Sequence, residues 1–297
     1  MDRLDITAPL VAGLVARQFP HWAHLPVRPV PWNGWDNATF LLGDAMTVRL
    51  PTAERYKAAV EKEQLWLPRL APLLPLPIPA PISEGRPDAT YPFAWSINRF
   101  IPGETTARER IGDLVAYASD LAGFLKALHR IDARVGPRAG PHNFHRGGDL
   151  AVYDAETRRC IARLGERIDG AAATACWETA LASHWTETPV WVHGDIAVGN
   201  LLVAEGKLRA VIDWGTSGVG DPASDLVIAW TFFDGESRAA FRDALSLDAD
   251  SWARARGWAL WKALLVTAEN GNLHPAETPA ETVIGLILDD YDAGLDP

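Results

Sequence analysis

The sequence predicts an α+β protein with strands early in the chain and helices late. Two observations lead to this prediction. Apolar segments bounded by turn residues indicate strands within 37–50 and 93–101. After residue 109, apolar residues recur with helical spacing. Strands and helices in separate parts of a chain are typical of packed layers. Because Pro102-Gly103 ends the second strand segment, we expect two domains, 1–101 and 102–297.

The early elements are a helix, a hairpin, a second helix and an extended proline-rich segment. The hairpin turn is expected at Gly43-Asp44. Pro68 is expected to kink or end the second helix, because proline lacks the N–H that a helix needs. In chain order, the four elements are predicted at 7–19, 37–50, 53–70 and 74–81.

The later part is mostly helical. A long amphipathic helix is expected first, followed by the polar segment 134–149. This segment is read as a surface loop, and a substrate lid built on His142, His145 and Arg146 is the alternative. Short strands are expected at 190–192, 201–203 and 208–212. Helices are expected at 109–130, 154–168, 171–184, 225–233, 237–245, 251–268 and 281–291.

The stretch VHGDIAVGNLLVAEGKLRAVIDWG holds polar residues at a spacing that phosphoryl transfer can use. Asn200 follows Asp195 by five residues, and Asp213 follows Asn200 by thirteen. A hydroxyl that attacks a phosphate needs a carboxylate to take its proton, and Mg²⁺ needs hard oxygen ligands. Asp195 is the candidate base, and Asn200 and Asp213 are the candidate metal ligands. Singly, such residues are more often turn or cap residues, but their conjunction favours catalysis.

A cation that grips the nucleotide phosphates is the other requirement. Arg49 is the one cation in the hairpin segment 37–50, between Val48 and Leu50. A cation flanked by apolar strand residues usually has a dedicated carboxylate, and Glu63 in the following helix is the candidate. The alternatives are Glu61 as partner, or an Arg49 that snorkels to the surface.

The polar loop 32–37 leads into the hairpin. A loop at this place can lay backbone N–H groups over phosphates. It contains a single glycine, so an ordinary turn is the alternative.

With these motifs, the sequence resembles the aminoglycoside phosphotransferase family of kinase-like small-molecule kinases. The strongest matches are VHGDIAVGN, VIDWG and GDPASDL, at 192–200, 211–215 and 220–226. Weaker matches are GWDN, VRLP, VEKE and IPGE, at 34–37, 48–51, 60–63 and 101–104. The resemblance covers most of the chain and is weakest in 136–149 and after 233.

The resemblance implies a bilobal protein-kinase-like fold that holds ATP between a β-rich lobe and a helical lobe, with GTP as the alternative donor. It implies that Asp195 is the base and that Asn200 and Asp213 bind Mg²⁺. Nucleotide binding falls to Arg49, Glu63, Asn37 and the hinge residues Arg99 and Ile101, whose backbone groups face adenine. His193 shapes the catalytic loop, and Asp225 anchors this loop by accepting backbone hydrogen bonds.

Arg49 departs from the family pattern, which has Lys at this strand position. A guanidinium also binds phosphate and carboxylate, but its planar fork differs in reach and shape from an ammonium group. The phosphate-binding half is therefore the less conventional part of the expected site.

Composition and charge limit the functional classes. The chain is 48% hydrophobic and 22% charged, as expected for a globular protein, and its net charge of −10 argues against nucleic acid or anionic membranes as partners. No apolar stretch approaches the length of a membrane span, and the first residues do not resemble a signal peptide, so we expect a cytoplasmic protein. Cys160 and Cys176 have no metal-ligand or disulfide pattern and are read as small buried side chains.

The acceptor is expected to be a small, cationic molecule with a hydroxyl group. After Lys262 the chain has seven acidic residues and no Lys or Arg. The whole chain holds 13 tryptophans, whose faces attract cations. Trp252, Trp258 and Trp261 lie in one predicted helix, where core packing is the alternative role. The resemblance suggests an aminoglycoside. Kinases of choline, homoserine or sugar type, and a nucleotide-binding regulator without turnover, are the alternatives. The oligomeric state is not predicted.

Overall fold

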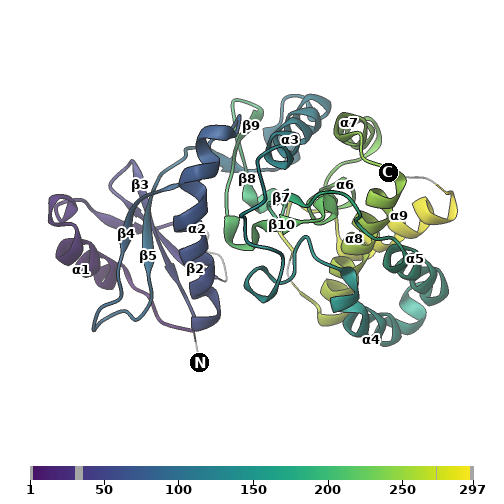
Figure 1. Ribbon diagram of the computed structural model, residues 1–297, viewed down its shortest axis with the longest axis horizontal. Helices are drawn as coiled ribbons and strands as arrows, with labels where there is room; N and C mark the ends of the chain where they lie inside the picture. The colour runs from purple at the N-terminus through teal and green to yellow at the C-terminus, as the bar shows by residue number, and fades with distance from the viewer. Residues whose placement is uncertain (1–2, 31–35, 272, 295–297) are drawn as a thin grey trace. The chain divides into compact units, whose positions relative to one another are not determined.

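The structure is a computed structural model that describes residues 3–30, 36–271 and 273–294 (Figure 1). Most of the predicted loop 32–37 lies outside these residues. The chain divides into two compact units. The first runs to Pro102 and also includes Val211–Gly215, and the second comprises Gly103–Ala210 and the chain from Thr216 onward. The predicted division after Ile101 had placed residues 211–215 in the helical part.

The first unit is built on a five-stranded antiparallel sheet with the order β1-β2-β3-β5-β4. Its centre is the predicted hairpin, in which β2 and β3 pair from Asn37↔Pro51 to Leu42↔Met46. Gly43 follows β2 with φ +61°, a backbone conformation that favours glycine. The strands are β1 (Val27–Pro29), β2 (Asn37–Leu42), β3 (Met46–Pro51), β4 (Pro81–Gly85) and β5 (Trp95–Arg99).

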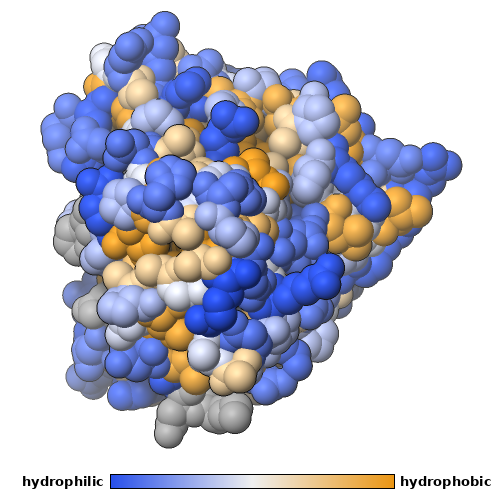
Figure 2. All heavy atoms as spheres, turned by 90° about the vertical axis from the view of Figure 1, so that its left-hand side faces the viewer, coloured by the Kyte–Doolittle hydropathy of each residue, from blue (hydrophilic) through white to orange (hydrophobic). Residues whose placement is uncertain are grey.

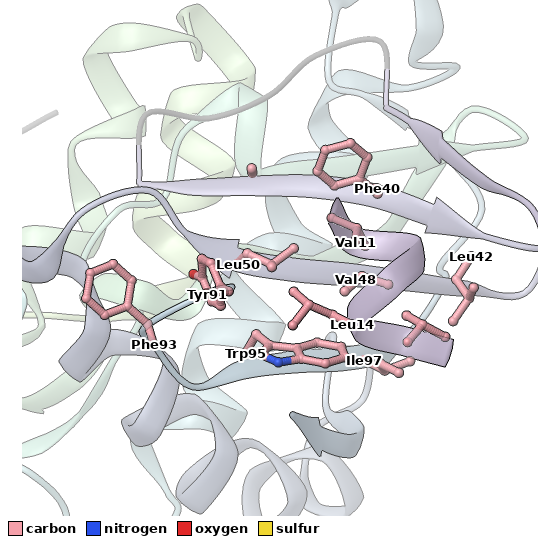
Figure 3. Packing of buried hydrophobic residues seen from close by; sticks show 12 residues of the cluster. Val11, Leu14, Phe40, Leu42, Val48, Leu50, Tyr91, Phe93, Trp95 and Ile97 are labelled. Carbon is pink, nitrogen blue, oxygen red and sulfur yellow. The ribbon is translucent and has the colours of Figure 1, made fainter. Parts of the chain in front are cut away.

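The core of this unit lies between the sheet and α1 (Ala8–Gln18) (Figure 3). Val11 and Leu14 of α1 contribute to the same buried cluster as Val48 and Trp95 of the sheet. Alternate residues of β3 point toward this cluster because side chains alternate along a strand. α2 (Lys57–Leu70) continues two residues past Pro68, where a 3₁₀ turn follows.

The second unit is mainly helical. Its helices are α3 (Leu114–His129), α4 (Asp154–Leu164), α5 (Gly170–Ala182), α6 (Ile228–Thr231), α7 (Gly235–Leu245), α8 (Ala249–Glu269) and α9 (Ala280–Asp292). Most side chains of α8 are buried, because α8 contacts α4, α5 and α9. Two small sheets complete the unit, with the orders β6-β8-β9 and β10-β7. Their strands are β6 (Glu104–Thr105), β7 (Val190–Val192), β8 (Leu201–Ala204), β9 (Lys207–Val211) and β10 (Gly218–Gly220).

The predicted and observed elements differ mainly at short segments. The helix expected from 109 begins at Leu114, because the Asp113 carboxylate accepts the N–H groups of Val115 and Ala116. The helix expected at 225–233 is a 3₁₀ turn followed by the short α6. The sequence did not predict β1, β4, β6 and β10, since two to five residues show too few alternations for a periodic signal.

The surface is mixed in character. Hydrophilic residues cover much of the face shown in Figure 2, with hydrophobic residues among them. In the part of the chain that the structure describes, no helix combines the length and the apolar character needed to span a bilayer.

Candidate active site

The loop after β7 carries His193, Asp195 and Asn200. The Asp225 carboxylate holds this loop: it accepts the N–H of His193 at 2.8 Å and the N–H of Gly194 at 2.6 Å. Gly194 has φ +85°, and a Cβ there would lie 2.5 Å from the Thr216 carbonyl oxygen. The sequence Gly194-Asp195 therefore allows a tight turn that a larger residue would block.

Asp225 and His193 are both fully buried. Burial raises the pKa of Asp225 to about 7, although the two N–H donors act in the opposite direction. The imidazole of His193 accepts the Asp195 N–H through Nδ1 at 3.3 Å, and the His193 carbonyl oxygen accepts the Thr216 hydroxyl at 3.0 Å. These contacts tie the loop to its surroundings, so His193 and Asp225 can shape it without contacting substrate.

Asn200 orients Asp195. Its Nδ2 donates to the Asp195 carbonyl oxygen and to Asp195 Oδ2, both at 2.9 Å. One carboxylate oxygen of Asp195, Oδ2, therefore has a neutral donor, and neither contact from Asn200 involves Oδ1. The Asn200 amide oxygen takes part in neither contact, because both use the nitrogen.

The first unit holds the second group of predicted residues. Arg49 Nη1 lies 3.2 Å from both oxygens of Glu63, and Arg49 Nη2 donates to Asp213 Oδ1 at 2.8 Å. Arg49 is on β3, Glu63 is on α2, and Asp213 follows β9. Burial lowers the pKa of the Arg49 guanidinium, but Glu63 and Asp213 outweigh this effect and hold its pKa above the usual range. The alternative partner of Arg49, Glu61, does not make this contact.

Lys62 is a member of this group that sequence reasoning missed. Its side chain is buried, and Nζ donates to the Gly215 carbonyl oxygen at 2.8 Å. Burial lowers its pKa to about 8, against the opposing charge of Glu63. Lys62 stands between two glutamates in sequence, a pattern typical of a solvent-exposed helix face. Only the structure shows that its side chain is buried and contacts the segment Val211–Gly215.

The exposure and contacts of Asp213 are compatible with the predicted role as a metal ligand. Its side chain is 44% exposed, and Arg49 engages only Oδ1. Its φ of +62° is unusual for a residue with a side chain, and such strain concentrates at functional sites. A carboxylate oxygen is a donor that Mg²⁺ accepts, and Mg²⁺ commonly takes one or two protein oxygens plus phosphates and water. Among the described residues, no group of three or more His, Cys, Asp or Glu side chains is placed to hold a metal ion.

The remaining predicted nucleotide residues lie at the sheet. Arg99 is the exposed last residue of β5, and Ile101 lies two residues beyond it. Asn37 begins β2 and is 6% exposed; its Oδ1 has no hydrogen-bond partner among the described residues. The structure thus gathers Arg49, Glu63 and Asp213 in one group and His193, Asp195, Asn200 and Asp225 in another.

The polar segment 134–149, predicted as a surface loop, is held by hydrogen bonds from a buried side chain. Asn143 is fully buried, and its Nδ2 donates to the carbonyl oxygens of Arg146 and Thr216 at 2.9 and 3.2 Å. Phe144 and His145 both have positive φ, 52° and 54°. A left-handed backbone at two successive residues with side chains is costly, and it persists only where the surroundings enforce it.

Comparisons with known proteins show the family to which the chain belongs. The chain matches the phosphotransferase enzyme family, APH, over residues 27–258. Two aminoglycoside 3'-phosphotransferases of Escherichia coli are 28% identical over 152 residues and 31% identical over 145 residues. Each match covers 46% of this chain and 52% of the relative, so the chain spans about half the length of the curated relatives it matches.

Solved structures of similar fold extend over nearly the whole chain. The GDP and kanamycin complex of APH(2")-IIia has a TM-score of 0.69 at 16% identity and covers 96% of this chain and 98% of its own. The streptomycin–ATP–APH(2")-IIa ternary complex has a TM-score of 0.61 at 20% identity, with coverage of 95% and 99%. A macrolide 2'-phosphotransferase from Brachybacterium faecium has a TM-score of 0.51 at 21% identity, with coverage of 96% and 93%.

Identities this low show the fold alone, but the family match is independent of them and covers more than half of the chain. The predicted fold class and the resemblance seen in the sequence are confirmed. The chain belongs to the phosphotransferase enzyme family and has the α+β, protein-kinase-like fold of the aminoglycoside phosphotransferases.

Proposed function

We propose that this protein transfers the terminal phosphate of ATP to a hydroxyl group of a small molecule. The observation that carries the proposal is the contact of Asn200 Nδ2 with both the carbonyl oxygen and Oδ2 of Asp195. It orients a carboxylate in a loop that Asp225 holds by two further hydrogen bonds. A fixed carboxylate is what a hydroxyl needs in order to be aimed and deprotonated.

Asp195 acts as the base in this proposal. Its Oδ1 accepts the hydroxyl proton as the oxygen attacks the terminal phosphorus, and ADP leaves. Asp225 is fully buried and acts through the backbone of His193 and Gly194, so it is a positioning residue. His193 has the same status, because its Nδ1 accepts the Asp195 N–H and its side chain is buried.

Asn200 and Asp213 would hold Mg²⁺ through the amide oxygen and the carboxylate. A Mg²⁺ ion held there would neutralise negative charge on the phosphates. Arg49 is held by Glu63 and Asp213, so its guanidinium is already oriented before nucleotide arrives. We assign phosphate binding to Arg49 and adenine binding to the backbone at Arg99 and Ile101, with Asn37 as a further nucleotide contact. ATP is the proposed donor, and GTP is its competitor in the test.

The relatives suggest where to look for the acceptor. The curated relatives are named aminoglycoside phosphotransferases, and one solved neighbour is a macrolide phosphotransferase. Cationic aminoglycosides are therefore the first acceptors to test, followed by macrolides, choline, homoserine and sugars. A nucleotide-binding regulator without turnover is the rival from another class, and the intact set Asp195, Asn200 and Asp213 argues against it.

The test is acceptor-stimulated release of ADP, measured with ATP or GTP and with or without Mg²⁺. We expect at least one acceptor to stimulate release, and Asp195→Asn to abolish the stimulation. Asp120→Asn is the matched control, because Asp120 is an exposed residue of α3 outside the site. Stimulated release that survives in Asp195→Asn would remove Asp195 from the mechanism, and release that no acceptor stimulates would favour the regulator.

A further inference from the structure

A narrow hollow in the second unit lies directly beside the proposed base. Its lining comes from the loop at 146, the catalytic loop, the 3₁₀ turn Pro222–Leu226, Val227 and α8. The lining residues are Arg146, Gly194, Asp195, Ile196, Ser224, Val227, Trp258 and Lys262. Because Asp195 is among them, a hydroxyl that Asp195 deprotonates belongs to a molecule that reaches this hollow.

The charges of this lining are the opposite of those that a polycation needs. Of the described residues that line the hollow, Asp195 alone carries a carboxylate, whereas Arg146 and Lys262 are cationic. Lys262 is partly compensated, since its Nζ lies 3.5 Å from Glu277. Arg146 has no carboxylate within 4.0 Å among the described residues. Burial lowers the pKa of Arg146, with Asp195 acting against this effect.

Arg146 is held in place by aromatic side chains. Its guanidinium carbon lies 5.2 Å from the ring centre of Trp258 and 4.6 Å from that of Trp261. Trp261 is itself fixed, because its Nε1 donates to Glu156 at 2.7 Å and its ring lies 4.2 Å from that of Tyr153. Stacking satisfies the faces of a guanidinium but leaves its N–H groups in the ring plane for a ligand.

The backbone that carries Arg146 is equally constrained. Asn143 Nδ2 binds the Arg146 carbonyl oxygen, and the Tyr153 hydroxyl donates to the Phe144 carbonyl oxygen at 2.8 Å. The left-handed conformations of Phe144 and His145 precede Arg146 directly. A strained segment held this firmly is typical of a functional site.

Three polar atoms on the lining residues are buried and have no hydrogen-bond partner among the described residues. They are Arg146 Nε, Ser224 Oγ and Trp258 Nε1. All three can donate, and Ser224 and Trp258 are only 4% and 1% exposed. Buried polar groups in folded proteins are nearly always hydrogen-bonded, so three unmet donors around one hollow call for a ligand rich in acceptors.

We infer that the acceptor carries an anionic oxygen group, a carboxylate or a phosphate, beside the hydroxyl that is phosphorylated, and that Arg146 binds this group. The inference rests on the proposed function and narrows its substrate class. It also gives three of the acidic residues near the C-terminus another role. Glu277 pairs with Lys262, Asp290 with Arg238 and Glu281 with Arg167, so these carboxylates serve internal contacts.

The test uses sets of acceptors that share a hydroxyl-bearing carbon frame and carry an anionic, a neutral or a cationic group. Glucuronate, glucose and glucosamine form one set, and glycerate, glycerol and serinol form a smaller one. Two readouts are taken for each compound: acceptor-stimulated ADP release, and the shift in melting temperature without nucleotide. We expect the anionic member of at least one set to raise the melting temperature and to show a KM about 10- to 100-fold below that of its neutral counterpart.

Arg146→Met is the central variant, because Met keeps an unbranched chain against the two tryptophans but lacks the charge. It should erase the advantage of the anionic acceptor and leave the KM for ATP unchanged. Arg146→Lys should restore part of it. Arg134→Met is the matched control, since Arg134 is 85% exposed and pairs with Asp132 at the surface. Melting temperatures without ligand show whether each variant folds.

Several outcomes would overturn the inference. A cationic or neutral acceptor that binds as well as the anionic one would do so, and the proposed function would stand. A raised KM for ATP in Arg146→Met would assign the guanidinium to the nucleotide phosphates instead. No response to any anionic compound in either readout also overturns it. If the anion stabilises wild type but not Arg146→Met, and no compound stimulates ADP release, the site stands and the proposed function fails.

Discussion

Arg49 donates a hydrogen bond to Asp213 across 164 positions of sequence, at 2.8 Å, while its other terminal nitrogen contacts Glu63. One guanidinium thus joins a strand, a helix and the segment Val211–Gly215 within a single unit. The planar fork of arginine explains why this arrangement works where the family pattern has lysine, since two of its nitrogens face two different carboxylates.

Removing the charge at Arg49 should destabilise the first unit. Arg49→Met leaves Glu63, which is 4% exposed, without its counter-ion, and a broken buried pair costs about 3–5 kcal/mol. Chemical denaturation measures the free energy of unfolding. Arg28→Met is the control, because the Arg28–Asp44 pair is exposed and such pairs contribute about 1 kcal/mol or less. An equal decrease in the free energy of unfolding in both variants would mean that the buried contacts of Arg49 stabilise the protein no more than an exposed ion pair does.

Arg49→Lys separates charge from shape. An ammonium group keeps the charge that Glu63 requires but cannot present two rigidly spaced nitrogens to Glu63 and Asp213 at once. We expect a smaller loss of stability than in Arg49→Met, together with a raised KM for ATP. If both variants leave ATP binding and turnover unchanged, Arg49 does not bind phosphate.

Lys62 should support the segment that carries Asp213. Lys62→Met leaves the Gly215 carbonyl oxygen without this donor, and an unmet buried acceptor costs about 1–3 kcal/mol. Denaturation and the KM for Mg²⁺ together measure the effect. Lys57→Met is the control on the same helix, because the Lys57–Glu54 pair is exposed. A Lys62→Met protein that matches this control in both measurements would reduce Lys62 to a packing residue.

His129 should make stability depend on pH. Burial lowers the pKa of His129 to about 4, against about 6.5 in an unfolded chain. Between these values the unfolded chain binds the extra proton, so the free energy of unfolding falls as pH drops from about 6.5 to 4, by up to about 1.4 kcal/mol per pH unit. His129→Gln should flatten this part of the curve, and His24→Gln, at an exposed position, should not. An unchanged slope in His129→Gln would show that His129 titrates normally.

Two glycines should respond to alanine in opposite directions. A Cβ at Gly220 would lie 1.9 Å from the Gly147 carbonyl oxygen, so Gly220→Ala must displace the loop next to Arg146. We expect a loss of at least about 1–3 kcal/mol. A Cβ at Gly123 meets nothing within 4 Å, so Gly123→Ala in α3 should stabilise by up to about 1 kcal/mol through helix propensity. Thermal denaturation of both variants measures these changes. A Gly220→Ala protein as stable as wild type would show that the loop at Gly147 shifts to accommodate the methyl group.

The residues that we propose for the reaction could be selected from the sequence because they lie close together along the chain. Asp195 and Asn200 are five residues apart and sit on one loop, so their spacing alone predicts that they meet. Arg49 and Glu63 could be paired in advance for a similar reason, since a strand and the next helix often face each other. The long helices were also predictable, because they span enough turns to show a period.

What the sequence left open depends on contacts between distant segments. Lys62 meets Gly215 across 153 positions, and neither residue carries a local sign of this contact. Arg146, Ser224 and Trp258 come from three separate elements, so no spacing reveals that their unmet donors surround one hollow. The sequence by itself thus determined the fold class and the family, because the motifs that carry the resemblance are local. Only the tertiary structure decided which charged side chains line the hollow beside Asp195, because the net charge of a chain does not show where ion-pair partners neutralise individual charges.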